Sequence, residues 1–186
     1  MTVSNNEHVK SALIETLRQG AHLLDSMADS AYGEKVPEVY DASIGGHYRH
    51  CLEHFQALVA VDGRVDYDAR KRNSLLETDR EQAMQATSSL LDHFKRMDPG
   101  VLGRSVEVRC KVSYLGDSTP WVASSLAREA VYSVVHAVHH YALIGVICGL
   151  RGIPVPDGFG VAPSTAKYQQ ELSKVDDEAL QACQGG

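Results

Sequence analysis

The sequence predicts a mainly α-helical fold, a four-helix bundle with a small β-hairpin before the fourth helix. Apolar residues recur at helical spacing in four segments, histidines line two of these, and one short stretch alternates between apolar and polar residues. The chain has 186 residues, 44% of them hydrophobic, which suits one domain with a proper core. We expect residues 1–163 to form the bundle and residues 164–186 to form a polar, partly helical tail.

Charge and cysteine content exclude some classes of function. The net charge is -6 and the 18 basic residues are spread thinly, so no basic stripe is available for a nucleic acid backbone. The four cysteines lack Cys-x-x-Cys spacing, and the amino terminus does not resemble a signal peptide. We therefore expect a cytoplasmic protein with reduced thiols that does not bind nucleic acid.

The apolar stretch from Ala130 to Leu150 approaches the length of a membrane span. Its centre, however, contains three histidines and Tyr141, and polar groups at that depth are costly in lipid. We expect a helix of the protein core and no membrane insertion.

The first two helices are predicted from apolar spacing and from helix-breaking residues. The first should run from Asn5 to about Ala31, followed by a break that contains Pro37. Ser43 is placed to cap a second helix that runs to about Val61. Glycines in the first turn of that helix would let a neighbouring backbone approach closely.

The charged segment 64–76 is expected to be an ordered loop. Thr78, with Glu81 three residues later, is typical of a capping box and predicts the start of the third helix. That helix should stop at Asp98-Pro99-Gly100, which are residues that break helices.

Residues 104–123 change from helical to alternating spacing, which predicts a strand, a turn at residues 116–118 and a short return strand limited by Pro120. Ser124 and Ser125 can cap the fourth helix, and Arg151-Gly152 can close it. This helix is apolar almost all round, so we expect other helices to enclose it.

Two histidine groups carry the chemical prediction. His136 and His140 are four residues apart and share one face of the fourth helix, whereas His139 points elsewhere. On the second helix, spacings of three and four place His47, His50 and His54 along one stripe. Facing helices of a bundle build metal sites in this way, and three neutral imidazoles leave a divalent ion with an open position. Hydrogen-bonded core histidines without a metal are the alternative.

Glu129 lies seven residues before His136, on nearly the same face of the helix. If it is buried, it could orient a ligand or serve as a base. Its simpler role is that of an acidic residue near the positive amino-terminal end of the helix.

Two motifs resemble those of the DinB-like (YfiT-like) superfamily of four-helix-bundle metalloenzymes. Residues 43–54 (SIGGHYRHCLEH) are similar to its second-helix motif, and residues 136–140 (HAVHH) to its fourth-helix motif. The resemblance extends loosely over residues 5–152. It implies a divalent ion, zinc or nickel, held by His50, His136 and His140, with His47 or His54 as alternative ligands.

By this resemblance the protein is expected to be a metal-dependent hydrolase or thiol transferase that acts on a small molecule or a low-molecular-weight thiol, and to form a homodimer. The alternative from another class is a dimerising or partner-binding bundle whose histidines are structural. A carboxylate-bridged di-iron site is disfavoured, because the stretch from Ala130 to Leu150 contains no Glu or Asp.

Overall fold

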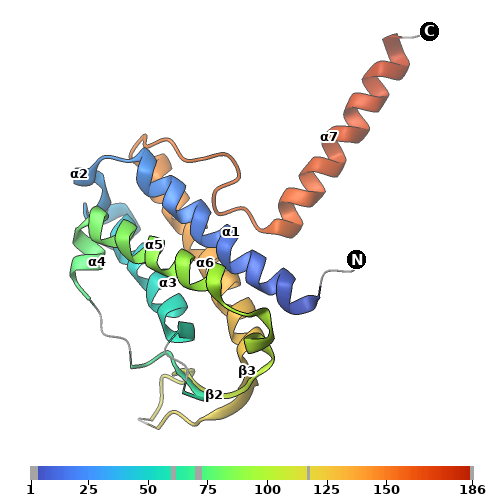
Figure 1. The fold of residues 1–186 in the computed structure, drawn as a ribbon. Coiled ribbons are helices and arrows are strands. Elements are labelled where there is room, and N and C mark those ends of the chain that lie inside the picture. Colours follow the sequence, from blue (N-terminus) through green and yellow to red (C-terminus); the bar gives the residue numbers. More distant parts are fainter. Residues whose placement is uncertain (1–3, 60–61, 70–72, 117, 185–186) are drawn as a thin grey trace.

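The computed structural model describes residues 4–59, 62–69, 73–116 and 118–184, with side chains described as far as residue 174. This part of the chain is mostly helical, with a small three-stranded sheet (Figure 1). The α-helices are α1 (Asn5–Ser26), α2 (Asp29–Tyr32), α3 (Ile44–Val59), α4 (Leu75–Thr78), α5 (Arg80–Arg96), α6 (Leu126–Leu150) and α7 (Pro163–Gln184). The 3-10 helices are η1 (Pro37–Val39) and η2 (Pro99–Gly103), and the strands are β1 (Arg64–Asp66), β2 (Ser105–Arg109) and β3 (Val122–Ser125).

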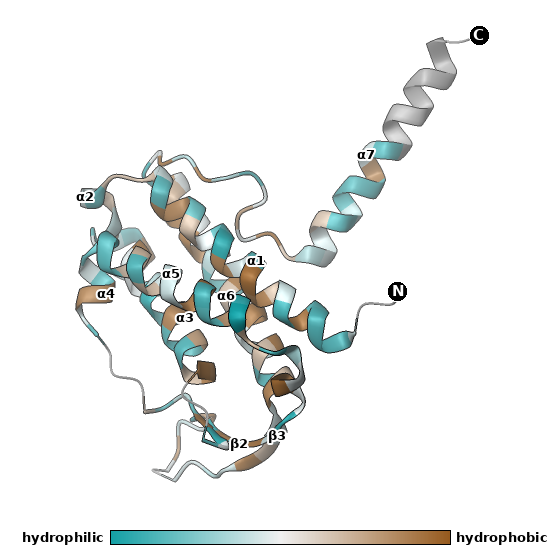
Figure 2. Cartoon of the chain, in the orientation of Figure 1, coloured by the Kyte–Doolittle hydropathy of each residue, from teal (hydrophilic) through white to brown (hydrophobic). Residues whose placement is uncertain are grey.

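Four long helices surround the core. Helix α3 packs against α6 and α5, and α1 packs against α5 and α6. Teal and brown bands alternate along α1 and α5 in Figure 2, as amphipathic helices require. The largest fully buried side chains are Tyr32, Tyr48, Tyr141, Phe55, Phe94, Leu13, Leu17, Leu23, Leu24, Ile44, Leu52 and Leu102.

Helix α1 ends at Ser26, earlier than the expected Ala31, and a separate short helix α2 follows. A tertiary contact explains the early end. The Arg80 guanidinium donates a hydrogen bond of 2.8 Å to the carbonyl oxygen of Leu24 and pairs with Asp29 at 2.5 Å. The last turn of α1 is therefore closed by a residue of α5, which local sequence spacing cannot reveal.

The predicted cap of α3 is confirmed. The Ser43 hydroxyl accepts a hydrogen bond of 3.0 Å from the backbone N–H of Gly46. Gly45 allows a close approach of α4, because a Cβ at this position would overlap the carbonyl oxygen of Glu77 and lie 2.8 Å from Cε1 of Tyr32. The beginning of α3 is thus held against α4.

The expectation of a loop over 64–76 was wrong at both ends. Residues 64–66 form β1, which pairs in parallel with β2, and residues 75–78 form α4. Val65 and Tyr67 are buried while Arg64 is exposed, so the segment has the alternation of a strand. Residues 70–72 of the predicted loop lie outside the described residues.

The predicted hairpin is present, with β2 and β3 paired antiparallel from Ser105↔Ser125 to Val108↔Val122. The return strand begins after Pro120, which cannot donate a ladder hydrogen bond. The sheet order is β1-β2-β3, so the sheet has one strand more than the hairpin we predicted.

The cap of α5 differs from the prediction. Thr78 is the last residue of α4, and the side chain of Asp79 instead accepts a hydrogen bond of 3.0 Å from the backbone N–H of Gln82. Asp and Thr are both good N-caps. Thr78 belongs to the short helix α4, so the next residue, Asp79, caps α5.

Helix α6 begins at the predicted cap Ser125, whose hydroxyl accepts a hydrogen bond from the N–H of Arg128, and Gly152 follows its end with a φ of 65°. The expectation of a fully enclosed helix was wrong. Large apolar side chains along one face are exposed, namely Val131, Val135, Val146 and Leu150. Within the described residues α6 is long and apolar enough to cross a membrane, but a single such helix is weak evidence because core helices meet the same criterion.

After α6 the chain returns to the body before it leaves as α7. The ring of Phe159 is buried and stacks on Tyr141, with ring centroids 4.9 Å apart. Gly160, at a φ of 71°, lies so close to α6 that a Cβ would be 2.6 Å from the backbone nitrogen of Ala142. Helix α7 then extends away from the other helices (Figure 1).

Candidate metal centre

Three histidines from two helices meet between α3 and α6. Nitrogen atoms of His50, His136 and His140 all lie within 4.8 Å of one another. One helical turn separates His136 from His140, and the close packing of α3 on α6 places His50 opposite both. The three rings are half-buried, with centroids 4.6 Å apart for His50 and His140 and 4.9 Å apart for His50 and His136.

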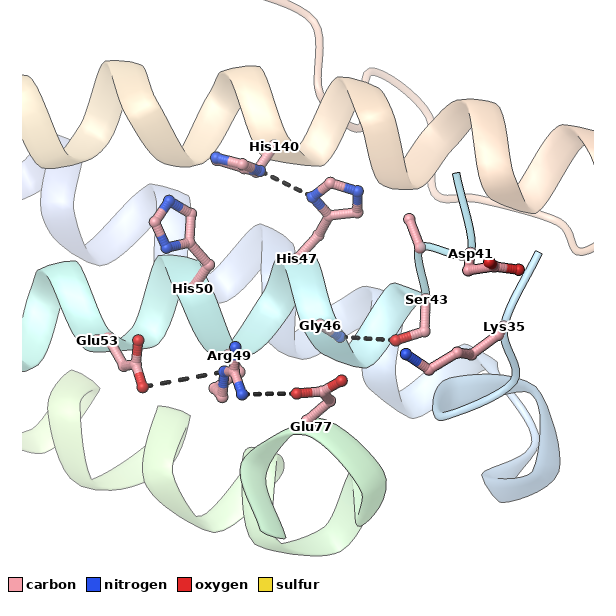
Figure 3. A pocket seen from close by; sticks show the side chains of 11 residues that line it. Lys35, Asp41, Ser43, Gly46, His47, Arg49, His50, Glu53, Glu77 and His140 are labelled. Atoms are coloured by element: carbon pink, nitrogen blue, oxygen red, sulfur yellow. Dashed lines mark hydrogen bonds and ion pairs between the residues drawn. The ribbon is translucent and has the colours of Figure 1, made fainter. Parts of the chain in front are cut away.

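The imidazoles are also hydrogen-bonded to one another in pairs. Nε2 of His136 lies 2.8 Å from Nε2 of His50, and Nδ1 of His47 lies 2.9 Å from Nδ1 of His140. Figure 3 shows His140 between His47 and His50. Each pair shares one proton, because a hydrogen bond between two imidazoles needs one N–H donor and one lone pair.

His54, the third histidine of the predicted stripe, is buried beside the same cluster. Its Nδ1 lies 2.9 Å from the backbone oxygen of His50, and only a protonated nitrogen can donate to a carbonyl. Its ring centroid is 4.3 Å from that of His136. His54 is therefore close to the three-histidine cluster, with Nδ1 already used by the backbone of α3.

Two tyrosines that the sequence analysis did not assign to the site pack against His54 and His136. Tyr67 stacks on His54 with centroids 4.9 Å apart, and Tyr132 stacks on His136 with centroids 5.5 Å apart. The spacing of Tyr132 and His136, four residues apart on α6, could have indicated the second contact. The first depends on β1, which was predicted as loop.

Glu129 is fully buried. Its carboxylate accepts hydrogen bonds from the hydroxyl of Tyr67 at 3.1 Å and from that of Ser124 at 2.6 Å, and it pairs with Arg128 at 3.1 Å. These contacts connect the chain after β1, strand β3 and the first turn of α6. The carboxylate is thus linked to the histidine cluster through Tyr67, which stacks on His54.

A cavity of about 400 Å³ opens beside the cluster. It is lined by Lys35, Asp41, Ala42, Ser43, Gly46, His47, Arg49, His50, Glu53, Glu77 and His140. Arg49 pairs with Glu77 at 2.5 Å and lies 3.9 Å from Glu53 (Figure 3). The wall of the cavity therefore carries both signs of charge next to imidazole nitrogens. The sequence analysis did not single out this wall, although Arg49 and Glu53 have the spacing of a helical ion pair.

Burial keeps the imidazoles of His140 and His47 in the neutral form, which is the form that binds metals. Burial, together with the neighbouring His136 and His47, lowers the pKa of His140 to about 3. Burial also lowers the pKa of His47, with His139 adding to the effect. Both rings are consequently neutral near pH 7, with a lone pair available.

Two of the cysteines, Cys51 and Cys148, belong to the hydrophobic core. Cys51 and Cys148 are buried, and burial raises the pKa of both, that of Cys148 to about 11. A thiol with a raised pKa is a poor nucleophile and a poor metal ligand at neutral pH. The side chain of Cys183 lies outside the described residues.

The donor set fits a divalent ion. Three neutral imidazoles are typical ligands of zinc and nickel, and nitrogens that share one zinc lie at most about 4.2 Å apart, twice the Zn–N distance. The nitrogens of His50, His136 and His140 already lie within 4.8 Å of one another, so small rotations of the side chains would bring them into this range. The cluster is compatible with a metal site, and the cavity beside it is lined by two of the three candidate ligands, His50 and His140.

Known proteins provide a partial similarity. A curated protein described as FK506-binding protein 5, from Rhizopus delemar, is 34% identical over 110 residues. The match covers 56% of this chain and 27% of that protein, so the chain spans less than a third of its relative's length. No protein-family model matches the sequence. No solved structure matches it at a significant level.

Proposed function

We propose that the protein is a DinB-like four-helix bundle, formed by α1, α3, α5 and α6, that binds one divalent metal ion through His50, His136 and His140. The observation that carries this proposal is the approach of these three imidazoles to within 4.8 Å of one another from two packed helices. Zinc and nickel are the ions that the donor set favours.

The proposed activity is that of a metal-dependent hydrolase or thiol transferase acting on a small molecule. A divalent ion with three imidazole ligands would keep one position open for water or a thiol, and it would lower the pKa of that bound group toward neutrality. The protein's part is to hold the three imidazoles close together and oriented, and to accommodate the substrate in the adjacent cavity. Arg49 and Lys35 at the wall of this cavity can orient an anionic group of a substrate.

Metal analysis of the purified protein tests the metal site. After removal of metal and reloading with zinc or nickel, the wild-type chain should hold one ion, and the variants His136→Ala and His140→Ala should lose most of it. His139→Ala is the matched control, because His139 lies on α6 beside His140 but is exposed. Unchanged metal content in both test variants, with folded helices by circular dichroism, would refute the site.

A second function is favoured by the hydrogen bonds between the imidazoles. The pairs His50–His136 at 2.8 Å and His47–His140 at 2.9 Å join four rings by hydrogen bonds without an ion, as a structural cluster in a partner-binding bundle would. This reading predicts that zinc, nickel and chelators leave the melting temperature unchanged. The metal-binding reading predicts that the ion raises it, since a ligand that binds only the folded state stabilises that state.

A further inference from the structure

His47 contacts His140, one of the proposed metal ligands, at the Nδ1 atom of that residue. The ion would bind the other nitrogen of His140, Nε2. Nδ1 of His47 lies 2.9 Å from Nδ1 of His140, and Figure 3 shows the two rings side by side with the other nitrogen of His140 on the side of His50. His140 therefore has one nitrogen directed to His47 and one directed to the cluster.

The chemistry of imidazole then fixes the protons. A neutral imidazole that gives one lone pair to a metal carries its proton on the other nitrogen. With Nε2 of His140 on the ion, its Nδ1 is an N–H donor, and Nδ1 of His47 must accept. The neutral ring of His47 then carries its own proton on Nε2. In the described part of the chain, Nε2 of His47 is buried and has no hydrogen-bond partner.

The other imidazole pair behaves differently. His50 and His136 are joined through their Nε2 atoms, 2.8 Å apart. If both rings give these lone pairs to one ion, their mutual hydrogen bond is lost. The bond between His47 and His140 uses the opposite side of His140 and is kept. It is thus a contact within the cluster that can orient a ligand both before and after metal binding.

We propose that His47 is a positioning residue of the metal centre, which holds His140 through Nδ1 in the tautomer that presents Nε2 to the ion. The inference rests on the proposed function and assigns His47 a role other than that of an alternative ligand. Contacts of this kind, from a group behind a ligand, typically contribute about 10–100-fold to metal affinity.

Metal affinity of the full-length chain, measured by competition with a chelating dye for zinc, tests the role. We expect His47→Ala to weaken zinc binding by about 10–100-fold. His47→Asn, whose amide oxygen can accept from Nδ1–H of His140, should recover most of that loss. His139→Ala, the control, should bind as the wild type does. Equal affinity of His47→Ala and the wild type would overturn the proposal.

Imidazole ¹⁵N chemical shifts of the zinc-loaded wild-type chain provide a readout that does not depend on how a variant folds. The proposal expects a metal-bound Nε2 and a protonated Nδ1 in His140, together with a protonated Nε2 in His47. A metal-bound Nδ1 in His140, or a metal-bound nitrogen in His47, would overturn it. Zinc binding with the wrong tautomers refutes only this inference, whereas a wild-type chain that binds no metal refutes the proposed function as well.

Discussion

The imidazole of His140 lies among other imidazoles and is half-buried, and both conditions disfavour its charged form. Its pKa in the folded, metal-free chain is lowered from 6.5 to about 3. Between these two values the unfolded chain binds a proton at this residue and the folded chain does not. The free energy of unfolding must therefore rise with pH across this window and fall on acidification.

We predict that the metal-free protein melts at a lower temperature at pH 5 than at pH 7.5, measured by circular dichroism with a chelator present. His140→Asn should reduce the difference between the two temperatures, because the residue that titrates only in the unfolded chain is gone. His22→Asn, an exposed histidine of α1, should keep the wild-type difference. A pH difference that is the same in His140→Asn and the wild type would contradict this account.

Because Gly45 has no side chain, α4 can approach α3 closely and place Glu77 in the wall of the cavity. A Cβ would overlap the backbone oxygen of Glu77, and Glu77 is the partner of Arg49 in that wall. We predict that Gly45→Ala lowers the free energy of unfolding by about 1–3 kcal/mol, the usual cost of overpacking, despite the better helix propensity of alanine. Urea denaturation measures this change.

Gly145, in α6, is the matched control. A Cβ there would meet nothing within 4 Å, so Gly145→Ala should stabilise the chain by about 0.5–1 kcal/mol. If the two substitutions had the same effect, close approach of α4 would not be the reason for glycine at position 45.

Among the elements, the residue that directly follows β1 is joined to α6 by a buried hydrogen bond between the hydroxyl of Tyr67 and the carboxylate of Glu129. We predict that Tyr67→Phe lowers the free energy of unfolding by about 1–3 kcal/mol, since it leaves a buried carboxylate oxygen without this donor. The phenyl ring can still stack on His54, so zinc content should stay at the wild-type level. Thermal melts and metal analysis check the two expectations.

Tyr168→Phe provides the comparison, because Tyr168 lies on α7 and is 60% exposed. It should change stability by no more than about 0.5 kcal/mol. A loss of zinc in Tyr67→Phe would instead mean that Glu129 acts on the metal centre through Tyr67, which is the orienting role that the sequence left open.

The helices that carry the histidines could be predicted because their signals are local. Ser43 and Ser125 cap their helices as expected, and residues four apart share a helical face whatever the rest of the chain does. Strand β1 could not be predicted in this way. Its partner, β2, lies some forty residues further on, and three residues are too few for a periodic signal.

At the scale of the whole molecule, the candidate metal centre also combines features that depend on local sequence with features that depend on how distant segments pack. The spacing of His136 and His140 is a property of α6 alone, whereas the arrival of His50 depends on how α3 packs against α6. The ion pair between Arg49 and Glu77 joins α3 to α4, and nothing in either segment indicates the other. The exposed face of α6 was mispredicted for a related reason: its hydrophobicity shows that the helix can be buried, but not what covers it.

The last part of the chain divides into a segment that packs on the body and a helix that does not. Phe159 is buried on Tyr141, and Gln19 of α1 accepts a hydrogen bond from the N–H of Gly160 and donates one to the carbonyl of Gly158. Helix α7 extends away from the body, and its described side chains are mostly exposed (Figure 1). Stability should therefore depend on residues 153–162 and little on α7.

We predict that a chain ending at residue 163 melts within about 2 °C of the full chain and holds the same amount of zinc, because few buried contacts are removed. A chain ending at residue 152 also loses the buried ring of Phe159, which costs about 3–5 kcal/mol and corresponds to a melting temperature at least about 6 °C lower. Differential scanning calorimetry of the three chains measures both differences. Equal destabilisation by the two truncations would show that α7 packs on the body, or on a second copy of it, in solution.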